Sequence, residues 1–401
     1  MGKVYVVAAK RTAIGSFLGG LSTVSVREYG AEVVKALLAE TGIKPTDVSE
    51  LICGNVLSAG IGQNIGRTIA LEAGIPDEVC AHSINMVCGS GMRSVMEAYM
   101  SIQSGFNDIV IAGGAESMSQ APYLIPYTTR TGNKMGDWKA IDHMIYDALT
   151  DARLNYHMGI TAENIATKYN ITREMQDNFA LMSQEKAIKA VDAGRFKDEI
   201  VPITVRSKKG DTVFDTDEHP NRTTNAEKLA KLKPAFKPDG GTVTAGNASG
   251  INDGASFVMV VSEDALKKFN LKPLCEIVGI GQGGVDPSVM GLGPVPAIRN
   301  ALKHAHVKLS DIELVELNEA FAAQSLGVVH ELVQEHGIDR EAFLKKTNVN
   351  GGAIALGHPV GASGNRIMVT LIHEMIKSDK HLGLASLCIG GGQGTAVILK
   401  R

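Results

Sequence analysis

The residue best suited to chemistry is Cys88, which ends the run 84–88 and is followed by Gly89, Ser90 and Gly91. A helical pattern begins directly after it, so the cysteine is expected between a strand and the N-terminus of a helix. Unpaired backbone N–H groups and the helix dipole favour an anion at such a position. The sequence therefore predicts a lowered pKa for this thiol and a thiolate able to act as a nucleophile.

Three segments near the end of the chain carry the partners that such a nucleophile needs. His358 lies in a glycine-flanked loop, 351–364, just before a helical pattern. Cys388 ends a strand-like run and precedes Gly390, so a second thiol is followed by backbone free of side chains. Asn318 ends another strand-like run. A nucleophile, a base and backbone donors are the ingredients of acyl transfer through a covalent intermediate.

Each of these residues alone also fits a structural role. A lone cysteine is often simply buried, and a histidine in a glycine loop is usually structural or exposed. The remaining thiols, Cys53, Cys80 and Cys275, lie in strand-like runs and are assigned to packing. The combination of the other two thiols with the histidine favours function over structure.

Alternating strand and helix patterns must position these side chains. Apolar runs predict strands at 4–9, 50–57, 80–87 and 108–112, and helical patterns separate them at 26–40, 67–73 and 91–104. Strands that are apolar on both faces and spaced by helices indicate a mostly parallel, layered α/β sheet.

The C-terminal part of the chain repeats the pattern of the first part. The matches run from 34–48 to 298–312 (shift 264), from 90–93 to 363–366 (shift 273) and from 113–114 to 391–392 (shift 278). Three matches in the same order indicate a duplicated domain. Cys88 then falls opposite Gly361, three positions after His358. Pseudo-twofold packing of the two halves would bring these junctions together.

Material of a different kind lies between the halves. Residues 119–249 contain Tyr-, Pro- and Gly-rich stretches, a charged loop, and helical segments for which Thr161 and Thr172 are the predicted N-caps. We expect three parts in the chain. Residues 1–118 with 250–272 form the first half, 119–249 an inserted loop domain, and 273–401 the second half.

The composition excludes several classes of function. The 401 residues carry a formal net charge of −3, which leaves no basic footprint for nucleic acid. No apolar run reaches membrane-spanning length, and the N-terminus shows no signal-peptide pattern. The five cysteines are scattered without metal-type spacing. We therefore expect no metal site, no membrane partner and a reducing, cytoplasmic location.

Five long segments together resemble the thiolase family, namely 85–91, 244–254, 318–321, 351–364 and 388–394. The match runs nearly end to end and is most similar to short-chain biosynthetic members, partly through 156–159. The resemblance implies two α/β/α/β/α layered halves, each with a five-stranded mixed sheet, plus the loop domain, assembled as a homotetramer. It also implies an acetyl-CoA C-acetyltransferase that makes acetoacetyl-CoA, with coenzyme A thioesters as substrates and no permanently bound cofactor.

The resemblance further implies roles for single residues. Cys88 would carry the acetyl group, His358 would deprotonate it, and Cys388 would remove the α-proton of the second acetyl-CoA. One oxyanion hole would consist of His358 and a water held by Asn318, and the other of the backbone N–H groups of Cys88 and Gly390. Contacts with coenzyme A are expected from His157, Met158, Ser249, Met290 and Phe321 along pantetheine, and from Arg222 near the nucleotide. The spacing around Arg222 departs by one position from the family pattern.

Other interpretations stay open on the sequence. A degradative 3-ketoacyl-CoA thiolase would share the fold and cleave longer chains, so pocket length would distinguish it. A decarboxylating ketoacyl synthase would pair one cysteine with two histidines or His and Asn, and Cys388 argues against it. A non-catalytic acyl-CoA or lipid binding module would be expected to lack one of the polar groups present here. Cys88 and Cys388 are also candidates for a reversible disulfide.

Overall fold

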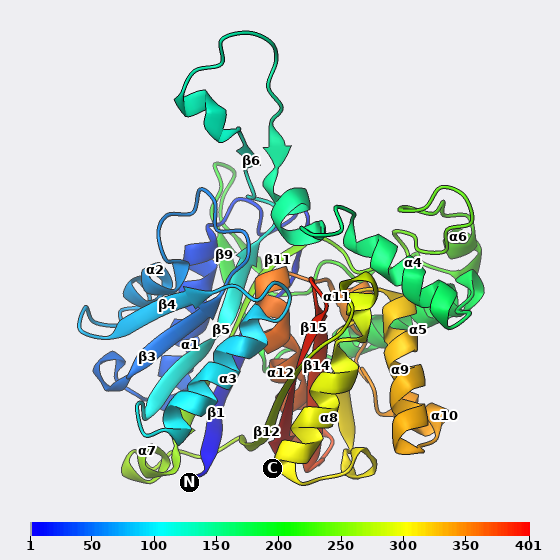
Figure 1. The fold of residues 1–401 in the computed structure, drawn as a ribbon. Coiled ribbons are helices and arrows are strands. Elements are labelled where there is room, and N and C mark those ends of the chain that lie inside the picture. The colour runs from blue at the N-terminus through cyan, green and yellow to red at the C-terminus, as the bar shows by residue number, and fades with distance from the viewer. Residues whose placement is uncertain (1) are drawn as a thin grey trace.

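A large mixed sheet forms the centre of the protein in the computed structural model, which describes residues 2–401 (Figure 1). Its main strands are β1 (Val4–Thr12), β3 (Glu50–Gly54), β4 (Cys80–Ile84), β5 (Ile109–Ser117), β11 (Asn252–Ser262), β12 (Cys275–Gly284), β13 (Leu314–Leu317), β14 (Leu382–Ile389) and β15 (Gln393–Lys400). They follow the order β13-β14-β15-β12-β1-β11-β5-β3-β4. The short strands β2 (Gly15–Ser16) and β8 (Ile200–Val201) join β11 and β1 off this path.

The sheet consists of two halves with the same strand order. The first half reads β4-β3-β5-β11-β1, and β13-β14-β15-β12 of the second half follow the order of β3-β5-β11-β1. The place of β4 is taken in the second half by a single bridge between Val315 and Thr347. The predicted duplication is present, and the sheets of the two halves are joined into one continuous sheet. The halves join because β1 pairs antiparallel with β12, for example through Tyr5 and Glu276.

Strand register relates the two halves residue by residue. The pairing of Glu50 with Val110 in the first half corresponds to that of Leu314 with Gly383 in the second. The shift between β5 and β14 is therefore 273, the same as between the helices that precede them. The predicted Gly-Gly match at a shift of 278 is wrong, because residues 391–392 lie in the turn after β14.

Helices complete a layered structure around the sheet. α3 (Ser90–Gln103) and α12 (Val360–Lys377) form the middle layer, where α12 packs on α3, β5, β11, β13 and β14 (Figure 1). α1 (Val26–Thr41) and α2 (Ile65–Glu72) cover the outer face of the first half, and α8 (Pro294–Ala305) and α9 (Ala322–His336) that of the second. Shorter helices are α7 (Glu263–Lys268), α10 (Arg340–Lys345) and α11 (Ala353–Leu356).

The two middle helices meet at their N-terminal ends. A Cβ added to Gly91 would lie 2.9 Å from the carbonyl oxygen of Gly361, so this approach requires glycine. Behind the contact, Val95 of α3 and Ile367 of α12 belong to one buried apolar cluster. Burial of such side chains contributes roughly 1.5–3 kcal/mol each. The packing therefore fixes the two strand–helix junctions relative to each other.

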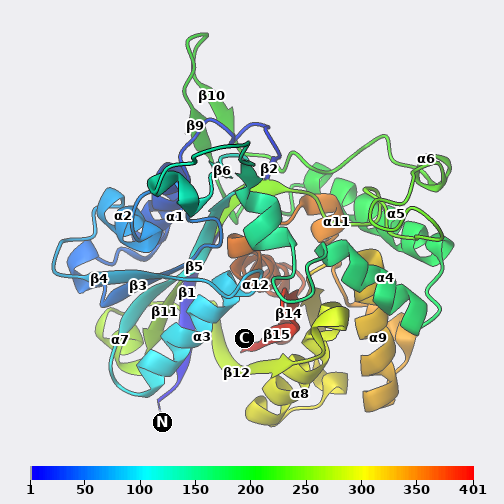
Figure 2. The same cartoon turned by 45° about the horizontal axis from the view of Figure 1, so that its top comes forward.

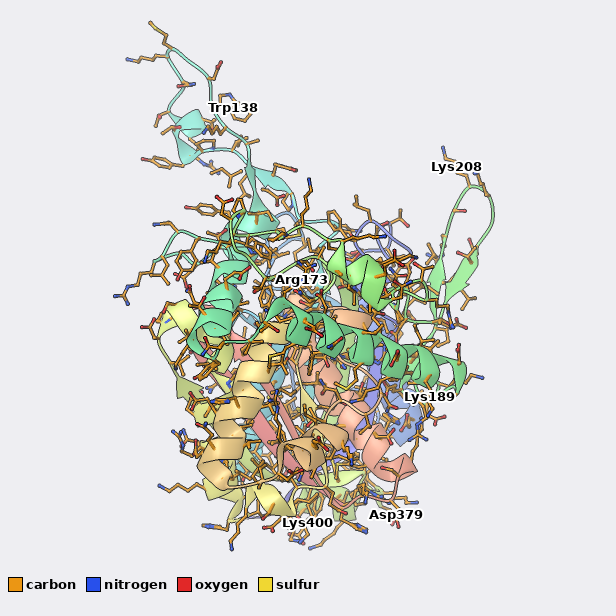
Figure 3. All side chains as sticks on the ribbon, turned by 90° about the vertical axis from the view of Figure 1, so that its right-hand side faces the viewer. Trp138, Arg173, Lys189, Lys208, Asp379 and Lys400 are labelled. Atoms are coloured by element: carbon orange, nitrogen blue, oxygen red, sulfur yellow. The ribbon has the colours of Figure 1, made fainter. Side chains whose placement is uncertain are left out.

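The segment between β5 and β11 leaves these layers at one end (Figure 2). It contains α4 (Met158–Lys168), α5 (Arg173–Asp192), α6 (Ala226–Ala230) and two hairpins, β6–β7 (Tyr123–Leu124, Ile141–Asp142) and β9–β10 (Ile203–Val205, Thr212–Phe214). Figure 3 shows both hairpins projecting from the same end, one marked by Trp138 and the other by Lys208.

Of the two helix N-caps predicted in this segment, one is confirmed and one is wrong. Thr172 caps α5, as predicted. The predicted cap at Thr161 is wrong, because α4 begins at Met158 and the His157 ring accepts the backbone N–H of Gly159 in place of a hydroxyl cap. Within residues 2–401, every helix is too short or too polar to cross a lipid bilayer.

Candidate active site

A cavity of about 610 Å³ opens where the two halves and the inserted segment meet. Eight of the residues predicted from the sequence line it: Cys88, His157, Met158, Ser249, Met290, Phe321, His358 and Gly390. Cys88 and His358 come from the equivalent junctions of the two halves. The fold therefore brings the thiol and the imidazole to one space, although 270 positions separate them in the chain.

Cys88 sits on a strained turn between β4 and α3. Val87 has a φ of +45°, which is a genuine outlier for a β-branched residue. Ser90 holds the turn, since its hydroxyl accepts from the Met86 backbone N–H at 2.8 Å and donates to the Val87 carbonyl at 2.7 Å. Strain of this kind costs on the order of 1–3 kcal/mol and is concentrated at functional sites. Here the strained turn carries Cys88 to the cavity.

The predicted lowering of the Cys88 pKa is wrong for the resting protein. Burial raises the pKa of this thiol to about 11, and the backbone N–H groups of Gly390 and Cys88 lower it only in part. The thiol keeps some exposure to the cavity, but α3 begins two residues later with Gly89 as its N-cap, so Cys88 precedes the helix end. At neutral pH the group is a thiol that needs a base.

His358 stands in the loop before α12, where its backbone and ring are both held. Gly357 has a φ of +102°, and a Cβ there would lie 2.5 Å from Asn252. The Asn252 amide oxygen accepts the His358 backbone N–H at 2.9 Å, and the ring Nδ1 lies 2.6 Å from the Ser363 hydroxyl. Burial, and after it the Arg366 guanidinium, lowers the pKa of His358 to about 3. The imidazole is therefore neutral near pH 7 and able to accept a proton.

Cys388 lies near the end of β14 and is fully buried, behind the residues that line the cavity. The segment around it touches the Cys88 turn, because a Cβ on Gly89 would lie 2.3 Å from Ile389 Cδ1. Burial first, and the charge of Cys88 second, raise the pKa of Cys388. The two thiols thus lie on adjacent segments.

Asn318 follows β13 and carries an unusual buried amide. Its backbone N–H donates to the Ser386 carbonyl at 3.0 Å. The side chain is buried outside the cavity lining, and neither its oxygen nor its nitrogen has a hydrogen-bond partner within residues 2–401. Buried amides are almost always hydrogen-bonded, so such a group calls for an ordered water or a ligand. A held water, as the family resemblance implies, would satisfy it.

Aromatic side chains form one wall of the cavity. The ring of His157 stacks on Phe236 with centroids 4.4 Å apart, and Phe236 meets Phe321 edge to face at 6.3 Å. Burial lowers the pKa of His157, so this ring is neutral as well. The Ser249 backbone N–H donates to the carbonyl oxygen of Ala320, the residue before Phe321. Flat apolar walls with a few polar groups suit a flexible, amide-containing arm such as pantetheine.

Two family models together match almost the whole chain. One, described as Thiolase, N-terminal domain, matches residues 4–264, and the other, described as Thiolase, C-terminal domain, matches residues 271–401. The chain belongs to the thiolase family. This thiolase is 53% identical over 399 residues to an acetyl-CoA acetyltransferase of Allochromatium vinosum, covering 99% of both chains. It is 50% identical over 404 residues to a probable acetyl-CoA acyltransferase of Staphylococcus aureus, covering 100% of both.

Solved structures are similar over the same length. The acetyl-CoA acetyltransferase from Syntrophomonas wolfei has a TM-score of 0.97 at 45% identity and covers 100% of both chains. Human mitochondrial 3-ketoacyl-CoA thiolase has a TM-score of 0.94 at 46% identity and covers 100% of this chain and 99% of its own. The duplicated α/β fold predicted from the sequence is confirmed.

A buried carboxylate that the sequence analysis does not single out joins the two halves of this thiolase. Glu116, at the end of β5, accepts hydrogen bonds from the backbone N–H groups of Val56, Leu57 and Gly361 and from the Asn55 amide, at 2.9–3.0 Å. Burial raises the pKa of Glu116 to about 7, and these donors oppose the shift. Because Gly361 is in the first turn of α12, this carboxylate fixes the start of that helix against the first half.

Arg222 is not part of the cavity. Its guanidinium pairs with Asp192 at 2.5 Å on the surface, where both side chains are more than half exposed. Exposed ion pairs contribute about 0–1 kcal/mol, so this one holds the arginine loosely. Its contact with the nucleotide of coenzyme A stays a prediction.

The residues that hold His358 are also missing from the sequence-based site. Both Asn252 and Ser363 lie in segments used for the family resemblance, and Ser363 also lies in the match that aligns the halves, but neither is given a role there. Their role depends on where folding puts the imidazole, and nothing in their local sequence marks it. A serine in the first turn of a helix is normally read as a structural residue.

Proposed function

We propose that this thiolase is an acetyl-CoA C-acetyltransferase, which reversibly condenses two acetyl-CoA molecules into acetoacetyl-CoA and CoA through an acetyl group on Cys88. One observation carries the proposal, namely that Cys88 and His358 line a single cavity from opposite halves, together with Gly390. Acetyl-CoA acetyltransferases that are 53% and 54% identical over at least 99% of each chain support it.

In the first half-reaction, Nε2 of His358 takes the proton of Cys88, and the thiolate attacks the carbonyl carbon of acetyl-CoA. The tetrahedral intermediate collapses, the CoA sulfur leaves with the proton of Cys388, and the acetyl group stays on Cys88. Cys388 is then a thiolate, and His358 keeps the proton that it took from Cys88. The raised pKa of the thiol and the lowered pKa of the imidazole keep both groups neutral at rest. The backbone N–H groups of Cys88 and Gly390, which lie at this sulfur, form the hole for the carbonyl oxygen.

In the second half-reaction, Cys388 as a thiolate removes the α-proton of the second acetyl-CoA and keeps it. The carbanion attacks the acetyl carbonyl, Cys88 leaves as a thiolate and takes its proton back from His358, and acetoacetyl-CoA forms. Such an α-proton is weakly acidic, so fixed donors must stabilise the charge on the thioester oxygen. Protonated His358 and a water held by Asn318 supply them, and loss of one such donor costs about 2.7–4 kcal/mol elsewhere.

The three parts of the chain divide this work. Residues 1–118 with 250–272 supply Cys88, and residues 273–401 supply His358, Cys388 and Asn318. The loop domain, 119–249, supplies much of the coenzyme A site. Pantetheine lies along His157, Met158, Ser249, Met290 and Phe321, with Arg222 near the nucleotide.

We also propose that the protein is cytoplasmic and assembles as a homotetramer through the loop domain. The projecting hairpin β6–β7, marked by Trp138 in Figure 3, exposes large apolar side chains. Tyr127 is 82% exposed and Met135 is 92% exposed. Grouped exposed apolar side chains on a projecting element are typical of contacts between proteins. Light scattering of the purified protein measures the assembly, and a monomer would contradict this part of the proposal.

The second candidate is a degradative 3-ketoacyl-CoA thiolase of broader chain length. The similarity to human mitochondrial 3-ketoacyl-CoA thiolase favours it. Initial rates of CoA-dependent cleavage of acetoacetyl-CoA and of 3-ketohexadecanoyl-CoA separate the two candidates. We expect the higher kcat/KM for acetoacetyl-CoA, and a preference for the long chain would overturn the assignment. Normal turnover by Cys88→Ala would instead favour a non-catalytic acyl-CoA binding protein with a contaminating activity.

A further inference from the structure

Ser363 is the hydrogen-bond partner of the His358 ring within residues 2–401. Its hydroxyl is fully buried and lies 2.6 Å from Nδ1 of His358 and 2.9 Å from the carbonyl oxygen of Pro359. A carbonyl can only accept, and a hydroxyl has one proton to donate. A hydroxyl that donates to Pro359 must therefore accept from His358, which places the ring proton on Nδ1.

The other ring nitrogen favours the same tautomer. Nε2 of His358 is buried and has no partner among the described residues. A buried N–H without an acceptor is rarer and costlier than an acceptor without a donor. The neutral ring is therefore more stable with its lone pair on Nε2. This is the atom that must take the proton of Cys88.

The first half shows what an equivalent serine does without an imidazole. Ser90 is the position equivalent to Ser363, because the two halves are related here by a shift of 273 residues. Ser90 is the first residue of α3, and Ser363 lies in the first turn of α12. Its hydroxyl accepts from the Met86 backbone N–H and donates to the Val87 carbonyl. Both serines thus donate to a carbonyl of the preceding turn and accept from an N–H group. In the second half, that N–H group belongs to the imidazole.

We propose that Ser363 is the positioning residue that holds His358 in the Nδ1–H tautomer, so that Nε2 can deprotonate Cys88; this inference rests on the function proposed above. Ser363 does not touch the substrate and acts through the imidazole. A histidine in the wrong tautomer fails as a base even where the geometry is kept. The consequence is selective, because acetylation of Cys88 needs the lone pair on Nε2. In α-proton removal the base is Cys388, and His358 acts as an imidazolium that is protonated on both nitrogens and has no tautomer to choose.

Ser363→Ala tests this selectivity, with Ser256→Ala as the matched control. The Ser256 hydroxyl is equally buried and lies 2.6 Å from Asn365 Oδ1 on the same helix. Quenched-flow mass spectrometry follows acetylation of Cys88, and loss of deuterium from labelled acetyl-CoA by preacetylated protein follows α-proton removal. We expect Ser363→Ala to slow acetylation at least ~10-fold and to slow exchange less. The loss of the whole general base, ~10²–10⁴-fold, is the upper limit. Ser256→Ala should change neither rate.

Unchanged acetylation in Ser363→Ala, or equal slowing of both steps, would overturn the inference. The 15N chemical shifts of His358 in labelled wild-type protein test it without any variant. We expect a protonated Nδ1 and an unprotonated Nε2, and the opposite tautomer would contradict the role of Ser363. Wild-type protein that does not acetylate Cys88 would instead remove the proposed function, so the two failures are distinguishable.

Discussion

The two halves of this thiolase build the same strand–helix junction and equip it differently. In the first half, a strained turn with Val87 at φ +45° carries a thiol into the cavity. In the second half, a loop with Gly357 at φ +102° carries an imidazole, held by Asn252 and Ser363. The duplicated fold thus places the two junctions at the same cavity, and the residues that differ between them supply a nucleophile on one side and a base on the other.

The difference extends to the strands behind the junctions. Asn318, which has an unpartnered buried amide, directly follows β13. The equivalent residue in the first half, at a shift of 264, is Gly54 at the end of β3. The second half therefore holds the base, the second thiol and the amide, whereas the first half holds the nucleophile. Glu116 links the two by binding the N–H of Gly361. Each prediction below changes one side of this comparison.

The largest effect is expected for the nucleophile. Cys88→Ala should lower kcat for acetoacetyl-CoA cleavage by about 10⁴-fold or more, as loss of a catalytic nucleophile does in other acyl transferases. Cys80→Ala, which removes an exposed thiol of the same half, is the control and should leave the rate unchanged. A Cys88→Ala protein with more than a hundredth of normal activity would contradict the role of this thiol.

The next largest effect concerns the pH dependence of Cys88. Because burial raises its pKa to about 11, the thiolate fraction should grow about tenfold per pH unit between pH 7 and 10. The rate of alkylation by iodoacetamide, followed by peptide mapping, should rise in parallel. A rate that is already constant below pH 7 would mean a resting thiolate–imidazolium pair, against the neutral pair described here.

Asn318 should matter to one half-reaction and not to the other. Asn318→Ala should lower kcat by about 10²–10³-fold through loss of one oxyanion donor, with little change in KM. The rate of Cys88 acetylation should stay close to that of the wild type. Equal losses in acetylation and turnover would show that the amide serves the fold instead of the enolate.

The contact between the halves can be tested at Gly361. A Cβ there would lie 2.5 Å from Glu116 Oε2, whereas a Cβ at Gly284 would meet nothing closer than 3.8 Å. Overpacking of a buried contact typically costs about 1–3 kcal/mol. Urea unfolding should show this loss of stability for Gly361→Ala and a much smaller one for Gly284→Ala. Equal stability of the two variants would argue against a tight junction.

The smallest effect is expected outside the cavity. Arg222→Ala should raise KM for CoA by about fivefold, which corresponds to loss of an exposed charge contact of roughly 1 kcal/mol. Its kcat should not change. An unchanged KM would limit Arg222 to its surface pair with Asp192.

The sequence predicts the parts of this site whose residue type carries the information. Cys88, His358 and Cys388 stand out in combination, because a nucleophile, a base and a second thiol near glycine backbone are the ingredients of acyl transfer. The repeated pattern also predicts that the junctions meet. The direction of the Cys88 pKa shift is not predictable in this way. It depends on how deeply the thiol is buried and on where α3 begins, and both are set by tertiary packing.

Supporting residues escape prediction for a related reason. Glu116 and Ser363 act through partners that are distant in sequence or defined only by the folded loop, such as Gly361 for Glu116. The merging of the two sheets through β1 and β12 is likewise a property of how the halves dock, since either strand alone reads as an ordinary edge.

The account is tested most directly by mass spectrometry of the wild-type protein mixed with acetyl-CoA and quenched with acid. Peptide mapping should find one acetyl group, on Cys88, and addition of CoA should remove it. An acetyl group on Cys388 instead, or no acetylated cysteine at all, would contradict the arrangement in which the imidazole of one half activates the thiol of the other.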